Sequence, residues 1–228
     1  MKIKTLLFSS FLLFFISCKK NSETNTPQPQ QDTYLTITAG STWNYHETDS
    51  SDTAASIETN YTVTSTTQDS SIGGKSYHVF TNSQRGNEYR NITGNDYYEF
   101  DSLPTGLGTS IFERLYLKDN AVAGTTWSQT LNVTYPGFSI PVPLTITYSI
   151  VEKGISLSVN GTSYTNVIHV ATSITSTLIQ STSLVTNINS YYAEKYGLIQ
   201  TTSIVTLDFL GTAQNINTET KLVNATLR

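Results

Sequence analysis

The chain has 228 residues, a formal net charge of −4 and 13% charged residues, against about 25% in an ordinary soluble domain. The acidic balance excludes a nucleic-acid binder that depends on bulk electrostatics, and the single cysteine excludes a disulfide-stabilised scaffold. Tyr is frequent, at 14 residues, and Thr, Val and Ile are also abundant. This composition predicts an all-β protein rather than a helical bundle.

The N-terminus resembles the signal of a bacterial lipoprotein. Lys2 and Lys4 precede an apolar run, Leu6–Ile16, that is shorter than the roughly 20 residues of a membrane-spanning helix. A small residue, Ser17, then precedes Cys18. The pattern predicts cleavage before Cys18 and acylation of its thiol, which would anchor the protein to a membrane through its acyl chains. The alternatives are an ordinary secretory signal with an incidental cysteine and an uncleaved anchor.

The chain is expected to have three parts. Residues 1–17 form the signal peptide, and residues 18–33 form the acylated cysteine and a flexible tether, which has no apolar residue besides prolines and so cannot order itself. Residues 34–228 form a single β domain. Loss of the signal peptide leaves 11 basic against 17 acidic residues. The acyl chains, rather than a basic patch, should therefore hold the protein at the membrane.

The residue after Cys18 bears on which membrane carries the anchor. Lys19 occupies this position, where an aspartate is associated with inner-membrane retention in enteric bacteria. The sequence therefore predicts an outer-membrane anchor, with the domain facing either the periplasm or the outside of the cell.

Apolar and polar residues alternate through the predicted domain, as they do in half-buried strands. Residues 144–150 alternate strictly, and residues 155–159 continue the pattern up to Asn160-Gly161. That dipeptide favours a two-residue hairpin turn, because both positions tolerate positive φ. We expect about ten antiparallel strands, arranged either as a barrel or as two facing sheets.

The domain also contains a weak internal repeat. Three motifs recur in the same order, at offsets of about 84, 87 and 94 residues: 39–43 and 123–127, 74–79 and 161–170, 97–100 and 191–196. A duplication would divide the domain into 34–115 and 116–228, and closure of one half against the other would protect their strand edges. The alternative is that Thr- and Tyr-rich strands resemble one another by composition alone.

Four features together carry a family resemblance. Cys18 precedes a domain that opens with Gly-Ser-Thr-Trp-Asn-Tyr at 40–45, and the segments 160–170 and 191–199 follow. This pattern is similar to that of a loose group of uncharacterised lipoproteins of Bacteroidota. The resemblance implies an all-β extracytoplasmic domain, lipocalin-like in its barrel character. It implies no activity and no catalytic residues.

The sequence offers few metal ligands. His46, His78 and His169 are expected at the surface, and a zinc site would need three or four converging ligands. Oxygen ligands near His46, such as Glu47 and Asp49, are the alternative for a hard cation. No cofactor is expected either, because the glycine-containing segments lack the spacing of nucleotide-binding loops.

Asp96, Glu99 and Asp101 form an acidic cluster. Glu99 and Asp101 lie about 7 Å apart if both are in one strand, a separation that an inverting glycosidase could use. A solvent-facing acidic turn is the expected arrangement. The sequence has no nucleophile elbow and no zinc-protease motif, so we expect no enzyme, with an envelope hydrolase as the minor alternative.

Two tripeptides resemble the O-glycosylation acceptor of exported Bacteroidota proteins. They are Asp52-Thr53-Ala54 and Asp101-Ser102-Leu103, and they predict modification of Thr53 and Ser102 in polar, turn-like stretches. Chance matches in a Thr-rich chain are the alternative.

The aromatic residues are the remaining candidates for a site. The candidate ligand-binding residues are Trp43, Tyr45, Trp127, Tyr148, Tyr191 and Tyr192. They would line a barrel mouth for an apolar or glycan ligand, unless they only fill the core. The sequence thus predicts a lipid-anchored binding module for such a ligand or for an envelope protein. A structural or surface-assembly lipoprotein without a small ligand is the main alternative.

Overall fold

The computed structural model describes residues 33–51, 55–103, 111–134, 140–209 and 212–228. Twelve strands lie in these residues. Their bounds are Thr42–Asp49 (β1), Ile57–Ile72 (β2), Lys75–Asn82 (β3), Gly86–Thr93 (β4), Asp96–Ser102 (β5), Ile111–Lys118 (β6), Thr126–Val133 (β7), Val142–Val159 (β8), Thr162–Ser176 (β9), Leu184–Ala193 (β10), Gly197–Phe209 (β11) and Thr212–Thr226 (β12). None of the described residues forms a helix long and apolar enough to cross a membrane.

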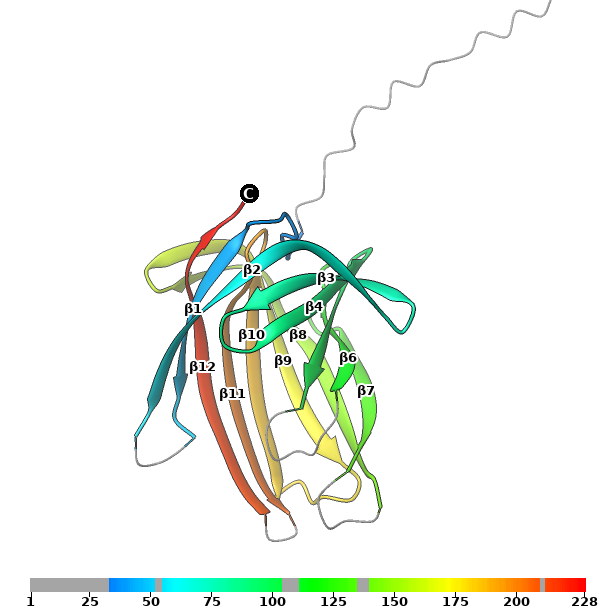
Figure 1. Ribbon diagram of the computed structural model, residues 1–228. Helices are drawn as coiled ribbons and strands as arrows, with labels where there is room; N and C mark the ends of the chain where they lie inside the picture. The colour runs from blue at the N-terminus through cyan, green and yellow to red at the C-terminus, as the bar shows by residue number, and fades with distance from the viewer. Residues whose placement is uncertain (1–32, 52–54, 104–110, 135–139, 210–211) are drawn as a thin grey trace, which may run out of the picture. The chain divides into compact units, whose positions relative to one another are not determined.

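All twelve strands belong to one antiparallel sheet in which consecutive strands pair, except for β6 and β7, which form its two ends. The two halves of the chain are joined by β1, which pairs with β2 on one side and with β12 on the other. The sheet therefore curls back on itself as a nearly closed barrel (Figure 1). This confirms the all-β fold and the barrel arrangement, and it excludes the alternative of two separate sheets.

The prediction of about ten strands was two short. One cause is that β4 and β6 carry charged residues such as Arg90 and Arg114, which interrupt the apolar alternation by which a strand is recognised. A second difference lies in β8. Residues 144–150 and 155–159, which looked like two patterns, form one strand of 18 residues that continues through a bulged region at Gly154.

The predicted hairpin turn at Asn160-Gly161 is confirmed. β8 ends at Val159 and β9 begins at Thr162, so these two residues alone connect the strands. Asn160 has φ of 48° and Gly161 has φ of 79°. Positive φ at both positions matches the right-handed twist of the flanking strands.

The sheet has two halves of six strands, β1–β6 and β7–β12. The first repeated motif begins β1 and β7, and the second lies at β3 and β9, which are equivalent strands of the two halves. The third motif lies in β5 and at the end of β10, which are not equivalent. The division that the sequence suggested between residues 115 and 116 falls within β6.

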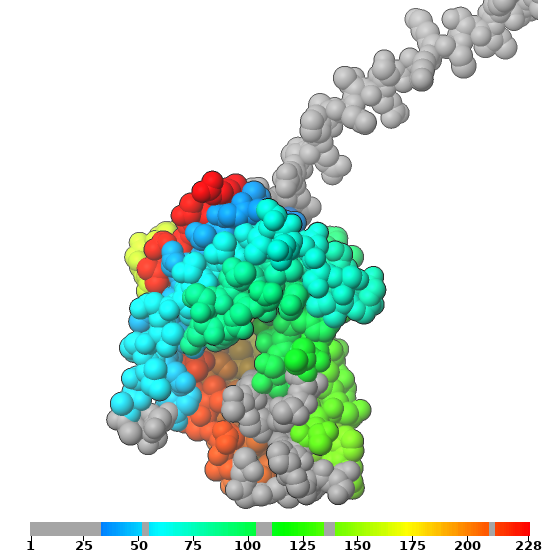
Figure 2. Space-filling view, viewed as in Figure 1, coloured from blue at the N-terminus to red at the C-terminus, as the bar shows by residue number. Residues whose placement is uncertain are grey.

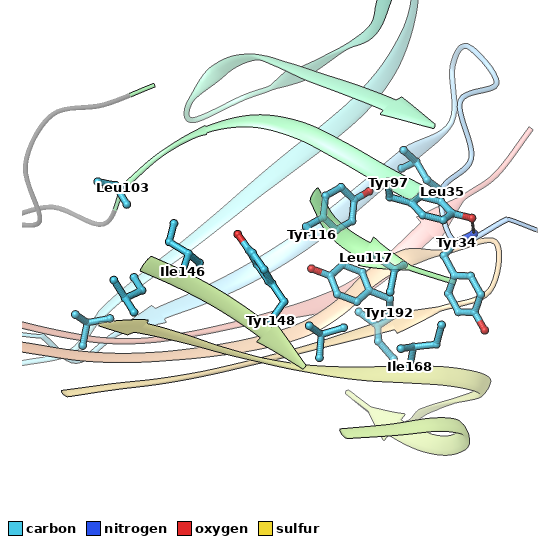
Figure 3. Packing of buried hydrophobic residues seen from close by; sticks show 14 of the residues in the cluster. Tyr34, Leu35, Tyr97, Leu103, Tyr116, Leu117, Ile146, Tyr148, Ile168 and Tyr192 are labelled. Atoms are coloured by element: carbon cyan, nitrogen blue, oxygen red, sulfur yellow. Dashed lines mark hydrogen bonds between the residues drawn. The ribbon is translucent and has the colours of Figure 1, made fainter. Parts of the chain in front are cut away.

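One end of the barrel is filled by the segment that precedes β1. Tyr34 and Leu35 are buried there beside Tyr97, Leu117 and Ile168 (Figure 3). The backbone N–H of Tyr34 donates to the hydroxyl of Tyr97 over 3.0 Å, and the Tyr34 hydroxyl donates to a backbone carbonyl of the β9 segment over 2.8 Å. The leading segment therefore acts as a plug that is tied to strands of both halves.

The two ends of the sheet, β6 and β7, meet at a seam without a strand–strand hydrogen-bond ladder. Two side chains of β7 cross it. The indole Nε1–H of Trp127 donates to the carbonyl of Leu115 over 2.8 Å, and Nε2 of Gln129 donates to the carbonyl of Glu113 over 3.0 Å. These bonds satisfy edge carbonyls that would otherwise be open to pairing with another chain.

The seam yields a test of how the barrel closes. Trp127→Phe removes the bond to the Leu115 carbonyl and part of the stacking on Tyr148, whose ring centroid lies 5.5 Å away. We expect the free energy of unfolding to fall by about 1–2 kcal/mol, measured by urea titration. The control is Ser128→Ala, an exposed neighbour on β7, which should change the stability by less than about 0.5 kcal/mol. Equal losses in both variants would contradict a closing role for Trp127.

Candidate functional site

The barrel contains two pockets beyond its plugged end, both partly open to solvent. One cavity of about 710 Å³ and a second of about 430 Å³ lie among the inward-facing side chains. They adjoin each other, because residues such as Arg114, Tyr116 and Tyr192 line both. Figure 2 shows a hollow below β3 and β4, with atoms of β11 and β12 visible at its back. Both volumes fall in the range of small-molecule sites.

Strand alternation decides which side chains reach this space. In β1, Trp43 and Tyr45 point inward and are buried, and Glu47 and Asp49 follow at the same parity and line the larger cavity. In β8, Ile146 and Tyr148 line the same cavity from the opposite wall. Figure 3 shows Tyr148 beside Tyr116 and Tyr192. The inner face is thus apolar at the plug and polar around the cavities.

A row of alternating charges crosses the inner wall on β4, β5 and β6. The Arg90 guanidinium lies 2.6 Å from a Glu88 oxygen and 3.8 Å from a Glu99 oxygen. Nε of Arg114 donates to Glu99 over 2.5 Å, and its Nη2 lies 3.2 Å from Asp101. The side chains of Arg90 and Glu99 are each only 17% exposed, so these pairs are largely shielded from water.

Burial and ion pairing act in opposite directions on the two arginines. Burial by itself would lower the pKa of the Arg90 guanidinium, but Glu88 and Glu99 outweigh it and raise that pKa above its ordinary value. The pKa of Arg114 is likewise raised, by Glu99 and Asp101, against the effect of burial. Both guanidiniums therefore stay charged and keep their carboxylate partners in place.

Tyrosines surround this charged row. The rings of Tyr116 and Tyr192 are 5.4 Å apart at an interplanar angle of 34°, and Tyr148 lies beside Arg114. Burial raises the pKa of all three phenols. Burial likewise raises the pKa of Tyr61, to about 12, against the lowering effect of Arg85. The phenols are therefore neutral hydroxyls at physiological pH, able to donate and accept hydrogen bonds.

The structure separates the six aromatic candidates. Tyr148 and Tyr192 line the larger cavity, and Tyr45 and Tyr192 line the smaller one. Trp127 does not line either cavity but stacks on Tyr148 at the seam.

The other two candidates lie away from both cavities. Trp43 is 2% exposed and packs against Phe80 in the core, and its Nε1 has no hydrogen-bond partner. Tyr191 lies on the face of β10 opposite to Tyr192 and stacks on His169 at 4.4 Å. Strand parity would have separated Tyr191 from Tyr192, but it does not distinguish a core position such as Trp43 from a cavity position.

The predicted modification sites fall in different places. Ser102 ends β5, is exposed and borders both cavities. Cys18 and Thr53 lie outside the described residues, so acylation of Cys18 and glycosylation of Thr53 remain predictions, as does glycosylation of Ser102.

The expected solvent-facing acidic turn is wrong for Glu99 and Asp101. Both point into the barrel from β5 and share Arg114, whereas Asp96 pairs with Lys118 at 3.0 Å. The reason is that β4 and β6 flank β5 and bring an arginine to each side of it. Neither arginine could be recognised from the sequence, because they lie 24 positions apart and both reach Glu99 only through strand pairing.

This arrangement bears on the glycosidase alternative. A glycosidase needs two carboxyl groups that are free to reach the scissile oxygen and a water or sugar carbon. Arg114 binds both Glu99 and Asp101, and the backbone N–H of Ser102 donates to the other oxygen of Asp101 over 2.8 Å. The carboxylates of Glu99 and Asp101 are thus occupied by contacts within the protein.

The three histidines differ in environment. His46 lies at the surface as expected, with a side chain 39% exposed and 2.7 Å from Glu58. The expectation was wrong for His78 and His169, whose side chains are only 14% and 12% exposed, because each packs against an aromatic ring of its own sheet face.

His78 also forms contacts that resemble a catalytic triad. Its Nε2 lies 2.8 Å from the Ser65 hydroxyl, and its Nδ1 lies 3.0 Å from Asp69. However, Ser65 is 1% exposed, donates to the carbonyl of Ile37 over 2.9 Å, and lines neither cavity. A substrate would have no path to this hydroxyl among the described residues. The contacts instead hold the leading segment against β2 and β3.

The structure gives no support for a metal centre at Glu47 and Asp49. Glu47 pairs with Arg85 at 2.8 Å and accepts a hydrogen bond from Thr220, while Asp49 accepts one from the backbone of Ser51. Among the residues that the structure describes, no three His, Cys, Asp or Glu side chains are grouped so that they could hold a metal ion.

Comparison with known proteins finds one similar fold. No protein-family model matches this chain, and no curated protein matches it. The crystal structure of a candidate lipoprotein from Parabacteroides distasonis is similar, with 11% identity, a TM-score of 0.47, and coverage of 86% of this chain and 99% of that chain. That organism belongs to the Bacteroidota.

The charged row predicts a specific stability defect. Arg114→Met leaves Glu99, which is 17% exposed, with only the more distant Arg90 as an ionic partner. Breaking a buried pair costs about 3–5 kcal/mol, and the partial exposure of Arg114 reduces the expected loss to about 2–3 kcal/mol in urea unfolding. In the control Lys221→Met, the partner Glu219 is 38% exposed and the loss should stay below about 1 kcal/mol. Equal losses would show that the interior row adds no more than a surface pair.

Proposed function

We propose that this protein is a lipid-anchored binding protein of the cell envelope, whose barrel holds a small ligand in its interior. The observation that carries this proposal is the pair of adjoining cavities, of about 710 and 430 Å³, inside the sheet. A barrel that served only as a structural spacer would gain stability by filling this space with side chains. A retained cavity with convergent polar groups is the usual form of a ligand site.

The proposed anchor is the acylated Cys18, in the outer membrane. It is supported by the layout of residues 1–18, in which a positive start, a short apolar run and a small residue precede the only cysteine. The tether of about 15 residues would reach about 45 Å if extended, at about 3.1 Å per residue. The barrel could therefore stand clear of the membrane surface and keep its interior accessible to water-borne ligands.

The walls of the cavities define what the ligand can be. Isoleucines on β8, β9, β10 and β12 supply apolar surface, and tyrosines, hydroxyls and paired charges supply polar groups. Such walls suit an apolar or a glycan ligand that is held on aromatic faces and oriented by a few hydrogen bonds. We propose binding without catalysis, because Arg114 occupies both Glu99 and Asp101.

The main alternative is a structural or surface-assembly lipoprotein that contacts an envelope protein and no small molecule. The strand edges at the β6–β7 seam are where such a partner could add, but Trp127 and Gln129 already cover two carbonyls there. The cavities favour a ligand-binding function over this alternative.

Filling the larger cavity tests the binding function. Ser203→Trp projects an indole into the cavity from β11, whereas Ile204→Trp places the same indole at an exposed position on the opposite face. The acylated protein in phosphatidylcholine nanodiscs should take up the uncharged dye N-phenylnaphthylamine, and Ser203→Trp should lose this uptake by about tenfold or more. Ile204→Trp should bind like the unaltered protein. Equal dye binding in both variants, after correction for empty nanodiscs, would count against an interior site.

The anchor has its own test. Cells fed an alkynyl palmitate should yield labelled protein, and Cys18→Ser should abolish the label, because no acyl chain can then be attached at this position. Lys19→Ser is the matched control and should keep the label. An unaltered protein that takes no label would point to an ordinary secretory signal, and a label that survives in Cys18→Ser would show acylation at another residue; either result would overturn the anchor at Cys18.

A further inference from the structure

We infer that the interior site takes an uncharged, hydroxyl-rich ligand, that is, a neutral glycan, and that it rejects anions such as fatty acids. This inference rests on the proposed binding function and names its ligand class. It follows from the charge balance of the cavity walls, from the hydrogen-bonding groups on them, and from the tyrosine faces beside those groups.

The charge balance disfavours an anionic ligand. Among the described residues, three guanidiniums line the two cavities, and five carboxylates outnumber them: Glu47, Asp49, Glu88, Glu99 and Asp101. The formal charge of the walls is therefore −2. An anion that entered would meet net repulsion from these walls.

Each of these guanidiniums already has a carboxylate of the protein as its partner, although Nε of Arg90 has no hydrogen-bond partner. Arg85 pairs with Glu47 at 2.8 Å, Arg90 pairs with Glu88 at 2.6 Å, and Arg114 is held by both Glu99 and Asp101. A ligand carboxylate or phosphate would have to displace a carboxylate of the protein, which would then be left without its charge partner. Anion-binding sites instead present unpaired guanidiniums or backbone N–H groups.

The same walls are rich in groups that exchange hydrogen bonds with hydroxyls. Threonines and serines on β9 to β12 line the larger cavity, and some already pair with each other, as Ser190 and Thr201 do at 3.0 Å. Thr220 donates to Glu47 over 3.1 Å. A saturated alkyl chain would cover these groups without replacing the hydrogen bonds that water makes to them, which is costly. Sugar hydroxyls can replace those bonds, since each both donates and accepts.

Tyrosine faces complete the site. Tyr116 and Tyr192 form one aromatic surface, with ring centroids 5.4 Å apart, at the boundary between the two cavities. Tyr148 stands nearby and is backed by Trp127, whose ring is nearly parallel to it, at 12°. A pyranose has an apolar C–H face that packs on such rings. Its hydroxyl rim would meet Asp101, Ser102 and the ion pair of Arg114 with Glu99. Aromatic faces next to ion-paired carboxylates thus match the two faces of a sugar.

The test compares ligand classes on the full acylated chain in phosphatidylcholine nanodiscs. A glycan array with neutral, amino and uronate-containing members is probed first. Hits are titrated by tryptophan fluorescence, to which Trp127, beside the cavity residue Tyr148, and the core residue Trp43 both contribute. Dodecanol and laurate, a neutral and an anionic alkyl chain of the same length, are titrated in parallel. Neutral glycans should bind, and their uronate counterparts should bind at least about tenfold more weakly.

Two matched variants check the residues. Tyr192→Leu should weaken binding of the neutral glycan by about tenfold or more, whereas Tyr191→Leu, on the opposite face of β10, should leave binding unchanged. Asp101→Asn removes one negative charge from the wall and should reduce the discrimination against uronates. It remains informative if Tyr192→Leu fails to fold.

The outcomes separate this inference from the binding function itself. If dodecanol binds and Ser203→Trp abolishes that binding while no glycan binds, the function stands and the glycan inference is overturned. The glycan inference would also be overturned if uronates bound more tightly than neutral glycans, or laurate more tightly than dodecanol. Binding confined to amino glycans would overturn it as well. If no probe binds the unaltered protein, both the inference and the binding function are overturned.

Discussion

The pairing of β1 with β12 is the interaction on which the rest of this structure depends. Eight residues of β1, from Thr42 to Asp49, are in register with residues 218–226 of β12 while their other edge pairs with β2. Without this contact the chain would form two separate six-stranded meanders, each with two long open edges. With it, twelve consecutive strands form one sheet that curls until β6 and β7 meet. The contact joins residues about 180 positions apart, so the loop-closure entropy must be offset by the plug and by burial across the sheet.

Closure of so long a sheet creates an interior that side chains only partly fill. At one end the leading segment, with Tyr34 and Leu35, packs against Tyr97 and Leu117 and completes a conventional apolar core. Farther along, the inward positions carry arginines, carboxylates, tyrosines and hydroxyls, and the space between them stays open. The interior is therefore divided by composition into a part that stabilises the fold and a part that is available for binding.

The charged row on β4, β5 and β6 connects these two parts. Its carboxylates and guanidiniums alternate, so each charge of the row has an opposite charge as its neighbour. The same pairing gives each guanidinium of the row a carboxylate partner, which is the basis for the proposal of an uncharged ligand. At the seam, Trp127 links the stability of the barrel to the cavity, since it both bonds to β6 and stacks on Tyr148.

The amino-acid sequence by itself determined the local features of this protein. Alternation marked the strand segment 144–150, Asn160-Gly161 fixed a hairpin turn, and the composition set the all-β class, because each depends on neighbours a few residues apart. Only the tertiary structure decided that Glu99 faces Arg114 rather than solvent, that Trp43 is core while Tyr192 is cavity wall, and that the sheet is one barrel. Those facts depend on strand order, register and curvature, which are set by contacts between distant residues and leave no signal in any short stretch of the chain.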